Sequence, residues 1–366
     1  MAEDSSFSPN LRALRSAIDA VDRELLEFIN RRAELARAIC KIEQQAPKPC
    51  RPTNAAHVIE QLQSTNDGPI PPEGIASIWH QITSACSELE TPFRIAYLGP
   101  AGTYTEEAAL AHFGAAVVRV PCVTLDEVFR VTTARAADFG VVPIENSTEG
   151  MVARSLDQFL TTPLTQIAEI SLEIRHNLLR KVDELAGISA VCAHPQALAQ
   201  CHAWLSANLP DAQRIPVASN AEGARRASLD AVLGAIASVR AGAQWRLRVV
   251  CPAIQDDANN RTRFAVLAHP SSQAAPRPTG HDRTSLIATV TNRPGALHDM
   301  LMPLKKHGVS MTRFESRPAR SGQWEYYFYL DLEGHVDDPN VRDALIELRN
   351  ACGFFKILGS YAAYVG

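Results

Sequence analysis

The longest regular pattern of apolar positions lies near the start of the chain. Between Leu11 and Glu43 there is neither proline nor glycine, and apolar residues recur alternately three and four positions apart. These residues are Leu11, Leu14, Ile18, Val21, Leu25, Phe28, Leu35, Ile39 and Ile42. The spacing predicts one long helix whose narrow apolar face needs helical partners. Pro47, Pro49 and Pro52 would end this helix.

Two shorter helices are predicted after the long one, over residues 55–64 and 73–90, with a proline-containing loop between them. One long and two short helices bury little surface when they pack only against each other. We therefore expect an all-α N-terminal domain over residues 1–91 that pairs with a second copy to form a homodimer.

From Phe93 onward, short apolar runs alternate with helical stretches. The runs cover residues 95–98, 140–144, 188–193, 215–218, 231–236 and 264–268, and the helical stretches cover 105–113, 125–134, 196–205 and 221–228. This alternation predicts an α/β domain over residues 92–270 with a mainly parallel sheet. Ligands in such folds bind in the loops at the strand ends, where this chain has Gly, Pro, Asn and Ser.

Residues 271–283 contain Pro, Ser and Gly and are predicted to form a linker. After them come strand patterns at 285–291, 309–316, 324–332 and 354–360, and helix patterns at 295–307 and 339–351. Their order, βαββαβ, predicts an α+β domain of ferredoxin-like fold over residues 284–366. The chain is therefore predicted to be multidomain.

Composition and charge narrow the classes of function. The 366-residue chain is 46% hydrophobic and 21% charged, as is usual for a globular protein. Its net charge of -4 gives no reason to expect nucleic acid or a membrane as partner. The N-terminus lacks the pattern of a signal peptide, and no segment approaches the roughly 20 apolar residues of a membrane span. The eight cysteines form no Cys-x-x-Cys pair, so we expect free thiols in a reducing cytoplasm, and neither a metal nor a cofactor.

Four loops place polar residues next to predicted strands. In the turn Leu98-Gly-Pro-Ala-Gly-Thr-Tyr-Thr105, Thr103 and Glu106 have the spacing of a helix capping box. The helix start there directs free N–H groups at a carboxylate or phosphate, or is only an ordinary helix start. The other loops are Val142-Pro-Ile-Glu-Asn-Ser147, His194-Pro-Gln196 and Asn260-Arg-Thr-Arg-Phe264. Taken singly, His194 also suits a loop hydrogen bond and Arg263 a surface ion pair.

Taken together and in this order, the loops resemble the prephenate dehydratase family. The resemblance includes Ser219-Asn-Ala-Glu-Gly-Ala224 and covers Phe93 to about His269. It implies a two-lobed α/β domain that converts prephenate into phenylpyruvate by coupled decarboxylation and dehydration, a step of L-phenylalanine biosynthesis.

This resemblance implies roles for individual residues. Loss of carbon dioxide supplies the electrons that expel hydroxide, so the enzyme needs a donor at the leaving oxygen rather than a strong base. Thr262 would be that donor, Glu145 would supply its proton, and Arg263 would clamp a substrate carboxylate. Phe264 would pack against the substrate ring or, more readily, in the core. The residues that would position the substrate are Thr103, Glu145, Asn146, Ser147, His194 and Gln196.

The N-terminal helices resemble the all-helical chorismate mutase domain that is fused to many dehydratases. Such a domain binds chorismate between the helices of a dimer and stabilises the charge of the transition state. Arg15 and Arg32 fall on the two arginines that this family has in its first helix. Arg32 also lies on the apolar stripe, where a salt bridge with a partner helix is the alternative.

Other positions of the mutase domain depart from the family. Glu43 stands where the family has a lysine that holds the ether oxygen of chorismate, and Glu90 falls near a second position that contacts this oxygen. Asn54 and Ala55 replace an expected Arg-Glu pair. We expect weak or absent mutase activity and mainly a dimerising role, unless a shifted register lets Lys41 substitute.

The C-terminal unit resembles the ACT regulatory domain of these dehydratases. Two motifs define the resemblance, Asn292-Arg-Pro-Gly-Ala-Leu297 at a strand-to-helix turn and Glu315-Ser-Arg-Pro318 after the next strand. It implies that L-phenylalanine binds as an allosteric effector and inhibits the enzyme by favouring a less active arrangement. The implied effector-binding residues are Gly295, Ala296, Leu297, Glu315, Ser316, Arg317 and Pro318.

Two other functions stay open. The dehydratase family usually has serine and glutamate where this chain has Ala193 and Val239, and Tyr-Gly-Leu where it has Trp245-Arg-Leu247. These departures suit a phenylalanine-binding regulatory relative that no longer turns over substrate. A generic solute-binding α/β protein is the other alternative, but it explains neither the fused helices nor the Glu-Ser-Arg-Pro motif.

Overall fold

The computed structural model describes residues 9–44, 55–87, 92–272, 276–291, 293–318 and 326–363. The chain divides into two compact units, one formed by residues 1–92 with 114–116 and the other by the rest of the chain. Over these described ranges, no helix has both the length and the apolar character that crossing a membrane requires.

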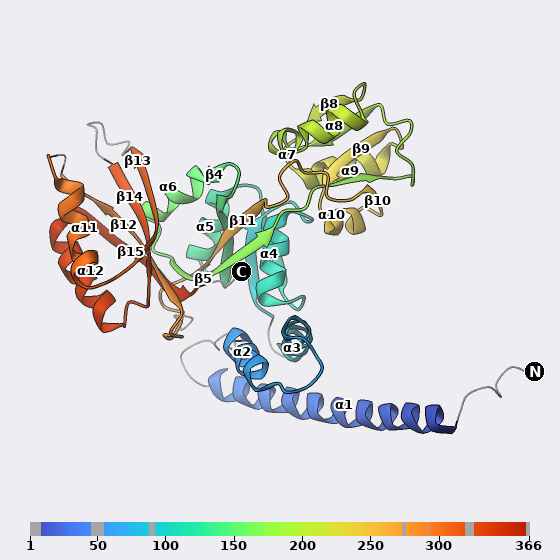
Figure 1. Ribbon diagram of the computed structural model, residues 1–366, viewed down its shortest axis with the longest axis horizontal. Helices are drawn as coiled ribbons and strands as arrows, with labels where there is room; N and C mark the ends of the chain where they lie inside the picture. The colour runs from blue at the N-terminus through green and yellow to red at the C-terminus, as the bar shows by residue number, and fades with distance from the viewer. Residues whose placement is uncertain are drawn as a thin grey trace, which may run out of the picture. The chain divides into compact units, whose positions relative to one another are not determined.

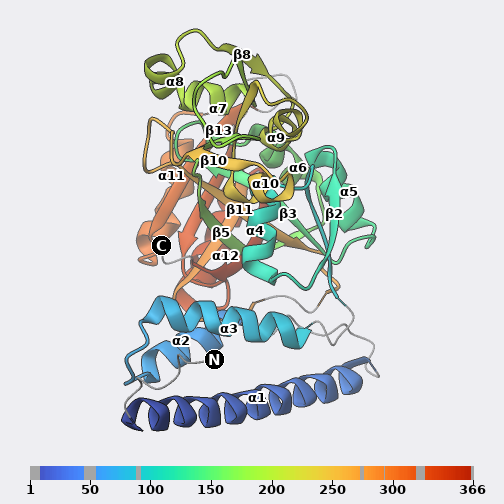
Figure 2. The ribbon, with the colours of Figure 1, turned by 90° about the vertical axis from the view of Figure 1, so that its right-hand side faces the viewer.

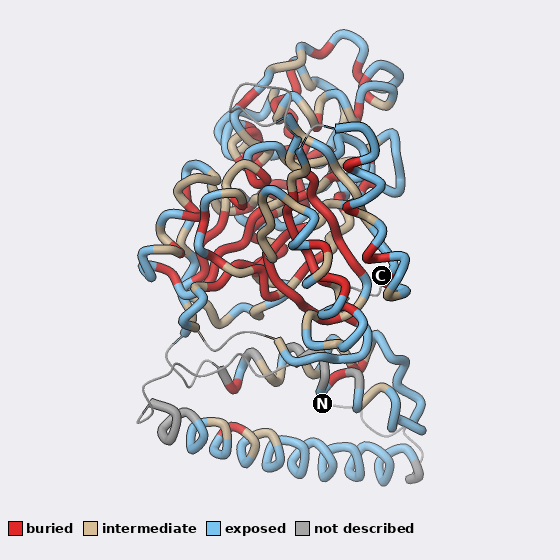
Figure 3. The backbone as a smooth tube through the Cα atoms, turned by 90° about the vertical axis from the view of Figure 1, so that its left-hand side faces the viewer, coloured by how far each residue is buried: buried red, intermediate tan, exposed pale blue. Residues whose placement is uncertain are grey.

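The first unit is built from the helices α1 (Pro9–Gln44), α2 (Ala55–Thr65) and α3 (Pro72–Ser87), as the apolar spacing and the prolines predict. Helix α3 contacts both α1 and α2, as Figure 2 shows. The apolar stripe of α1 is nevertheless exposed along nearly its whole length (Figure 3). Leu14 is 63%, Ile18 60% and Phe28 66% exposed, so a long apolar face of the single chain meets solvent.

The second unit begins with two α/β lobes (Figure 1). The first lobe contains β1 (Arg94–Leu98), α4 (Tyr104–Phe113), β2 (Val118–Cys122), α5 (Leu125–Thr133), β3 (Phe139–Asn146), β4 (Gly150–Met151), α6 (Ala153–Thr161), β5 (Thr165–Glu173) and β11 (Arg261–Ala268). The second lobe contains β6 (Asn177–Arg180), β7 (Ala190–Ala193), α7 (Pro195–Gln200), α8 (His202–Asn208), β8 (Gln213–Pro216), α9 (Asn220–Leu229), β9 (Leu233–Ala237), α10 (Val239–Gln244) and β10 (Arg248–Cys251). The strand orders are β2-β1-β3-β11-β5, with β4 paired to β3, and β10-β6-β9-β7-β8.

The sheets of both lobes are mixed, where the sequence pattern predicts mainly parallel pairing. Strand β1 pairs in parallel with β2 and β3, and β7 pairs in parallel with β8 and β9. Strand β11 lies antiparallel between β3 and β5, and β6 lies antiparallel between β9 and β10. Strand β11 is antiparallel because the chain returns to the first lobe directly from the second lobe, without the βα crossover that parallel neighbours need.

The helix predicted over residues 196–205 is divided at Cys201 into α7 and α8. Asp256 caps the start of α8, because its carboxylate accepts hydrogen bonds from the N–H groups of Ala203 at 3.1 Å and Trp204 at 3.3 Å. The N–H group of Asp256 in turn donates to the carbonyl of Gln200 at 2.7 Å. A contact with a distant part of the chain therefore starts a second helix within the stretch whose apolar pattern predicts a single one.

Two crossing segments connect the lobes, residues 174–176 after β5 and residues 252–260 before β11. The segments are bonded to each other: Ile174 N–H donates to the carbonyl of Asn260 at 2.8 Å, and Ile254 N–H donates to that of His176 at 2.7 Å. Strands β5 and β11 lie side by side where the crossings begin, as Figure 1 shows. The crossings thus bring residues that are distant in the sequence to one place.

The C-terminal domain has the predicted βαββαβ order. Its elements are β12 (Asp282–Thr289), α11 (Ala296–Lys306), β13 (Met311–Pro318), β14 (Tyr326–Glu333), α12 (Pro339–Ala351) and β15 (Phe354–Ala362). The strands form an antiparallel sheet of order β13-β14-β12-β15. Met300 and Leu304 of α11 and Leu345 of α12 pack with the sheet in one buried cluster. The ferredoxin-like fold is confirmed.

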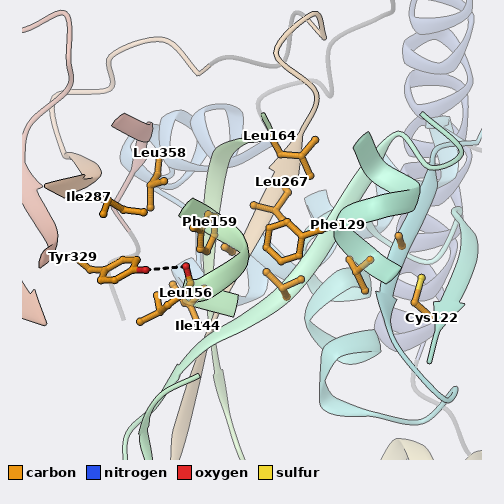
Figure 4. Packing of buried hydrophobic residues seen from close by; sticks show 14 of the residues in the cluster. Cys122, Phe129, Ile144, Leu156, Phe159, Leu164, Leu267, Ile287, Tyr329 and Leu358 are labelled. Carbon is orange, nitrogen blue, oxygen red and sulfur yellow. Dashed lines mark hydrogen bonds between the residues drawn. The ribbon is translucent and has the colours of Figure 1, made fainter. Parts of the chain in front are cut away.

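Another part of this sheet packs against the first lobe (Figure 4). The buried side chains at this contact come from α6 and from three strands of the sheet: Leu156, Phe159, Ile287, Tyr329 and Leu358. The Tyr329 hydroxyl donates to the carbonyl of Leu156 at 2.9 Å. Strand β15 approaches β5 so closely that a Cβ atom on Gly359 would lie 1.9 Å from the carbonyl oxygen of Gln166, so only glycine fits there. One continuous core joins the C-terminal domain to the first lobe.

Candidate active site

Thr262 lies near the start of β11, directly opposite Asn146 of β3. Its Oγ1 atom accepts a hydrogen bond from Asn146 Nδ2 at 2.8 Å. Because this bond uses a lone pair of the hydroxyl and not its hydrogen, Thr262 can donate to a substrate oxygen. Next to this pair, Ser147 Oγ accepts from the N–H group of Arg261 at 2.9 Å. This bond joins the end of β3 to the start of β11. The arrangement suits a donor to a leaving group.

The amide of Asn146 has a fixed orientation. Its Oδ1 atom accepts from the backbone N–H groups of Thr148 at 3.1 Å and Glu149 at 3.2 Å. Since a backbone N–H can only donate, the Asn146 atom facing these groups is the oxygen. The Nδ2 group therefore faces Thr262, and also Asn260 Oδ1 at 2.9 Å. Asn146 is 7% exposed, so its bonds to the protein replace bonds to water.

Three residues to which the sequence motifs assign no role extend this network. Asn260 Nδ2 donates to Gln200 Oε1 at 3.0 Å, and His176 Nε2 lies 2.9 Å from the same oxygen. Gln200 follows Gln196 by one helical turn, and Asn260 directly precedes the strand that contains Thr262, so spacing could have indicated both. No local pattern marks His176, which the chain crossing brings into place.

The glycine turn before α4 holds a buried carboxylate of its own. Glu106 is fully buried; its Oε2 atom accepts from Gly102 N–H at 2.6 Å, and its Oε1 atom accepts from Arg119 at 3.0 Å. Thr103 Oγ1 donates to the carbonyl of Leu98 at 2.8 Å and accepts from the Glu106 N–H group at 3.4 Å. The predicted capping by Thr103 is therefore present, and the Gly102 amide is occupied by a residue of the chain itself.

His194 begins α7. Its Nδ1 atom accepts from the backbone N–H of Gln196 at 3.3 Å, and the backbone N–H of His194 donates to Asn220 Oδ1 at 2.9 Å. Burial lowers the pKa of His194, against the opposing charge of Glu149. Ala193, at the position where a serine is usual, is fully buried. The structure thus places His194 and Gln196 at one helix start, with the imidazole acting as the capping acceptor.

Val239 is the first residue of α10 and is 60% exposed. Ser238 before it caps the helix by accepting from Ala241 N–H at 3.2 Å. Glu107 of α4 lies against Ser238, and burial raises the pKa of its carboxyl despite the opposing hydrogen bond of Ser238 and the charge of Arg240. A carboxyl group therefore lies beside this helix start although position 239 is a valine.

Arg263 points to the opposite face of β11 from Thr262, as adjacent residues of a strand do. Its guanidinium donates to Glu145 at 2.6 Å, to Glu169 at 2.6 and 2.9 Å, and to Asp331 at 3.1 Å. Burial alone would lower the pKa of Arg263, but these three carboxylates raise it overall. The structure does not bring Arg263 or Glu145 together with Thr262. Neither the clamp nor the proton supply expected of them follows from this geometry.

Phe264 is a core residue. It is 2% exposed and lies in a buried cluster with Ile95, Val141 and Ile170 of the first lobe. The pairing register between β11 and β3 shifts between Arg263 and Phe264. The extra residue at this shift, Ile144, belongs to β3, so β11 keeps its alternation and Phe264 packs into the core by its position in the strand. A core position is the alternative that the sequence favours for this residue.

Three ranges of the chain match known families. Residues 14–91 match chorismate mutase type II, residues 95–272 match prephenate dehydratase, and residues 284–350 match the ACT domain. The bifunctional chorismate mutase/prephenate dehydratase of Neisseria gonorrhoeae is 44% identical to this chain, and that of Pseudomonas aeruginosa is 41% identical. Each match covers 96% of this chain, and 96% and 97% of those proteins respectively. The chain belongs to the bifunctional chorismate mutase/prephenate dehydratase family.

A solved structure agrees with this assignment. The prephenate dehydratase from Arthrobacter aurescens, in complex with L-Phe, is similar with a TM-score of 0.68 and 36% identity. The similarity covers 74% of this chain and 90% of that one. The range that matches the dehydratase family contains Thr262, Asn146 and the residues bonded to them. Among the residues that the structure describes, no group of His, Cys, Asp and Glu could hold a metal ion.

The two predicted effector motifs of the ACT domain lie at the start of α11 and at the end of β13. Gly295 precedes α11 with a φ of 80°, a left-handed conformation that favours glycine. Ala296 is buried, and Leu297 is 39% exposed. The second motif, Glu315 to Pro318, ends β13.

A pocket of about 500 Å³ lies between β13 of the ACT domain and the first dehydratase lobe. Its lining includes Glu145 and Met151 from the lobe, and Arg313, Glu315 and Arg317 from the ACT domain. Arg313 lies 3.7 Å from Glu145, which also bonds to Arg263. The pocket therefore joins part of the effector motif to the charge cluster behind Thr262.

The chorismate mutase domain places one of its predicted site residues between helices. Arg32 Nη2 of α1 donates to Thr83 Oγ1 of α3 at 3.4 Å. Arg15 lies on the same helix, nearer its start. The other positions singled out in this domain, whose side chains lie outside the described part of the chain, are Lys41, Glu43, Asn54, Ala55 and Glu90. Their roles stay predictions.

Proposed function

We propose that the central domain converts prephenate into phenylpyruvate with Thr262 as the donor to the leaving hydroxide. The observation that supports this is the Thr262 hydroxyl, which accepts from Asn146 and keeps its hydrogen for the substrate. Departure of carbon dioxide supplies the electron pair that expels hydroxide, and the ring becomes aromatic. A neutral hydroxyl is sufficient because no step requires a strong acid or base.

The substrate is positioned by groups at the loop ends of the two lobes. Arg263 is engaged on the other face of β11, so a substrate carboxylate has to meet other donors. The candidates are residues of the motif loops: Thr103, Asn146, Ser147, His194 and Gln196. His194 and Gln196 lie together at the start of α7 in the second lobe.

L-Phenylalanine inhibits the reaction through the ACT domain. The bound L-Phe in the similar Arthrobacter structure and the two ACT motifs of this chain support this. We propose that residues 295–297 and 315–318 contact the effector. The shared core with the first lobe and the ion pairs of Arg263 with Asp331 give the ACT domain a direct connection to the strand of Thr262.

The N-terminal domain forms the homodimer and has weak chorismate mutase activity. The exposed apolar stripe of α1 supports the dimer, because a face of this kind is stable when covered by another helix. Glu43 supports the weak activity, since a carboxylate in place of a cation repels the dianionic substrate. The proposed domains are residues 1–91, 92–270 and 284–366, with a linker at 271–283 whose last two residues already belong to β12. We propose the cytoplasm as the place of the enzyme.

The test is to incubate the purified full-length protein with prephenate, then separately with chorismate, and to follow phenylpyruvate. We expect product from prephenate, slow product from chorismate, and slower turnover of prephenate when L-phenylalanine is added. Absence of product from prephenate would overturn the proposal and favour a regulatory relative that only binds phenylalanine. Rapid product from chorismate would contradict the weak mutase.

A further inference from the structure

A group of side-chain hydrogen bonds leads to Thr262. Which group donates and which accepts in each bond can be derived from two backbone N–H groups. These are the N–H groups of Thr148 and Glu149, which can only donate and which point at Asn146 Oδ1. The amide of Asn146 therefore turns its NH2 group toward Asn260 Oδ1 at 2.9 Å and Thr262 Oγ1 at 2.8 Å.

The same reasoning fixes the next two amides. Because Asn260 Oδ1 accepts from Asn146, its NH2 group faces Gln200 and donates to Gln200 Oε1 at 3.0 Å. Gln200 consequently turns its own NH2 group to Thr148 Oγ1 at 2.6 Å, and the Thr148 hydroxyl donates to Asn146 Oδ1 at 2.6 Å. These four residues close a ring in which each side chain donates to the next. The second N–H of Asn146 leaves the ring toward Thr262 Oγ1 at 2.8 Å, with the carbonyl of Arg261 as a more distant acceptor at 3.2 Å.

His176 enters the ring at Gln200. Its Nε2 atom lies 2.9 Å from Gln200 Oε1, which the ring has already assigned as an acceptor, so the proton of His176 is on Nε2. The imidazole is 3% exposed, and its burial lowers its pKa although the hydrogen bond with Gln200 acts to raise it. The lowered pKa favours the neutral form of His176. Its Nδ1 atom lies 3.2 Å from the Tyr104 hydroxyl, whose single hydrogen serves either this nitrogen or the carbonyl of Arg175 at 2.7 Å.

We propose that His176 is a positioning residue of the dehydratase reaction: its Nε2–H group holds the Gln200 amide so that the ring keeps the Thr262 hydrogen directed at the substrate. This inference rests on the proposed function of Thr262 as donor. If the Gln200 amide turned over, its NH2 group would face the NH2 group of Asn260, and the ring would be broken. An intact ring also polarises its members in one direction, which makes Thr262 a better donor.

The ring spans both lobes, because Asn146 lies on β3 of the first lobe and Gln200 on α7 of the second. His176, which is bonded to the ring, lies on the crossing segment 174–176, and Thr262 lies on β11 of the first lobe. The bonds therefore form only when α7 is placed against β3 and β11 as it is here. In this way His176 ties the orientation of the donor to the placement of the two lobes.

The experiment compares kcat and KM for prephenate in the full-length wild type, His176→Leu and His176→Gln, without L-phenylalanine. Removal of the Nε2–H donor in His176→Leu should lower kcat about tenfold, the value of one buried hydrogen bond, with little change in KM. His176→Gln should restore much of kcat, because its NH2 group can donate to Gln200 at a similar reach. If His176 had only a structural role, the kcat of His176→Gln would equal that of any other His176 variant of similar stability.

Two controls separate positioning from folding. His335→Leu replaces an equally buried histidine of the ACT domain, 3% exposed, and should lower the melting temperature without lowering kcat. In a Thr262→Ala background, His176→Leu should cause no further loss of kcat, because the ring then has no hydroxyl to direct. If His176→Leu does not fold, His176→Asn replaces it, since the shorter amide is polar but does not reach Gln200.

The outcomes distinguish this inference from the proposed function. A wild type that forms no phenylpyruvate overturns the proposed function itself. An active wild type with an equally active His176→Leu variant, or without recovery in His176→Gln, overturns the role of His176 alone. A further loss of kcat in the Thr262→Ala background would also contradict it, because His176 would then act by another route.

Discussion

At the scale of single residues, the neighbours Thr262 and Arg263 show how a strand divides chemistry between its two faces. Thr262 meets Asn146, whereas Arg263 bonds to three carboxylates, one of them Asp331 of the ACT domain. Successive side chains of a strand point to opposite faces, so only one of two adjacent polar residues can face the same site. The Thr-Arg-Phe motif therefore combines the proposed donor, a structural cation and a core residue.

The role of Thr262 leads to a prediction at the same scale. Thr262→Ala should lower kcat for prephenate by about 100- to 1000-fold, the usual effect of removing one donor to a developing charge. Phenylpyruvate formation measures the rate. Binding of L-phenylalanine, measured by calorimetry, should be unchanged, because the effector motifs lie in the ACT domain.

Thr262→Ser is the matched control for this variant. It keeps the hydroxyl that accepts from Asn146, so it should retain turnover within about tenfold of the wild type. If Thr262→Ala also retains most of its turnover, Thr262 only positions the substrate ring and the leaving hydroxide has another donor.

At the scale of elements, α1 is the helix whose environment the single chain leaves incomplete. Leu25 is 51% and Ile39 is 55% exposed, although both belong to the apolar stripe. The face that contacts α3 includes Arg32, whereas the stripe residues on either side of it stay in solvent. An exposed stripe of this length supports the proposed dimer, because helices with such a face are stable when another helix covers it.

The proposed dimer can be tested on this helix. Ile18→Asp places a charge on the stripe, so sedimentation should show a shift from dimer to monomer because burial of an unpaired carboxylate is unfavourable. Ser16→Asp introduces the same charge on α1 at a position outside the stripe, and it should leave the dimer intact. A dimer that survives Ile18→Asp would show that another surface holds the two copies together.

At the scale of the whole molecule, the cluster around Arg263 joins the dehydratase and ACT domains through charge. Burial of Glu169 acts to raise its pKa, but the hydrogen bonds and charges of Arg263 and Arg283 outweigh it and hold the pKa below its ordinary value of 4.5. Glu169 also lies near the hydroxyl of Tyr361. A carboxyl whose pKa is lower in the folded than in the unfolded state stabilises the fold above the unfolded value, and this contribution is lost as the pH falls through the folded value.

Glu169→Gln tests this linkage. At pH 7 the variant should lose roughly 3 kcal/mol or more of unfolding free energy, because Arg263 and Arg283 are left with fewer partners in a buried site. The difference from the wild type should shrink as the pH falls below 4.5, because the carboxyl of the unfolded wild type binds a proton before that of the folded protein does. Urea unfolding at several pH values measures it, with Glu173→Gln in the exposed Arg175 pair as a control that should change little. A difference that stays constant with pH would contradict the linkage.

The sequence by itself determined the features that depend on neighbouring residues. The apolar period predicted α1, the βαββαβ order of the C-terminal domain was confirmed, and Thr103 caps the helix that its spacing indicated. The motifs also singled out Thr262 as the candidate donor, a role that stays a prediction. Local backbone preferences and the periodicity of apolar residues are sufficient for such features.

Only the tertiary structure decided which distant residues meet Thr262. The chain crosses twice between the lobes, and this makes β11 antiparallel to β3 and places Gln200 and His176 beside Asn146 and Asn260. It also directs Arg263 at Asp331, against the expectation of a substrate clamp. No local pattern encodes these contacts, because they depend on strand direction and on the packing of one lobe against another. The sequence therefore indicated the proposed donor, whereas the fold decided which residues lie around it.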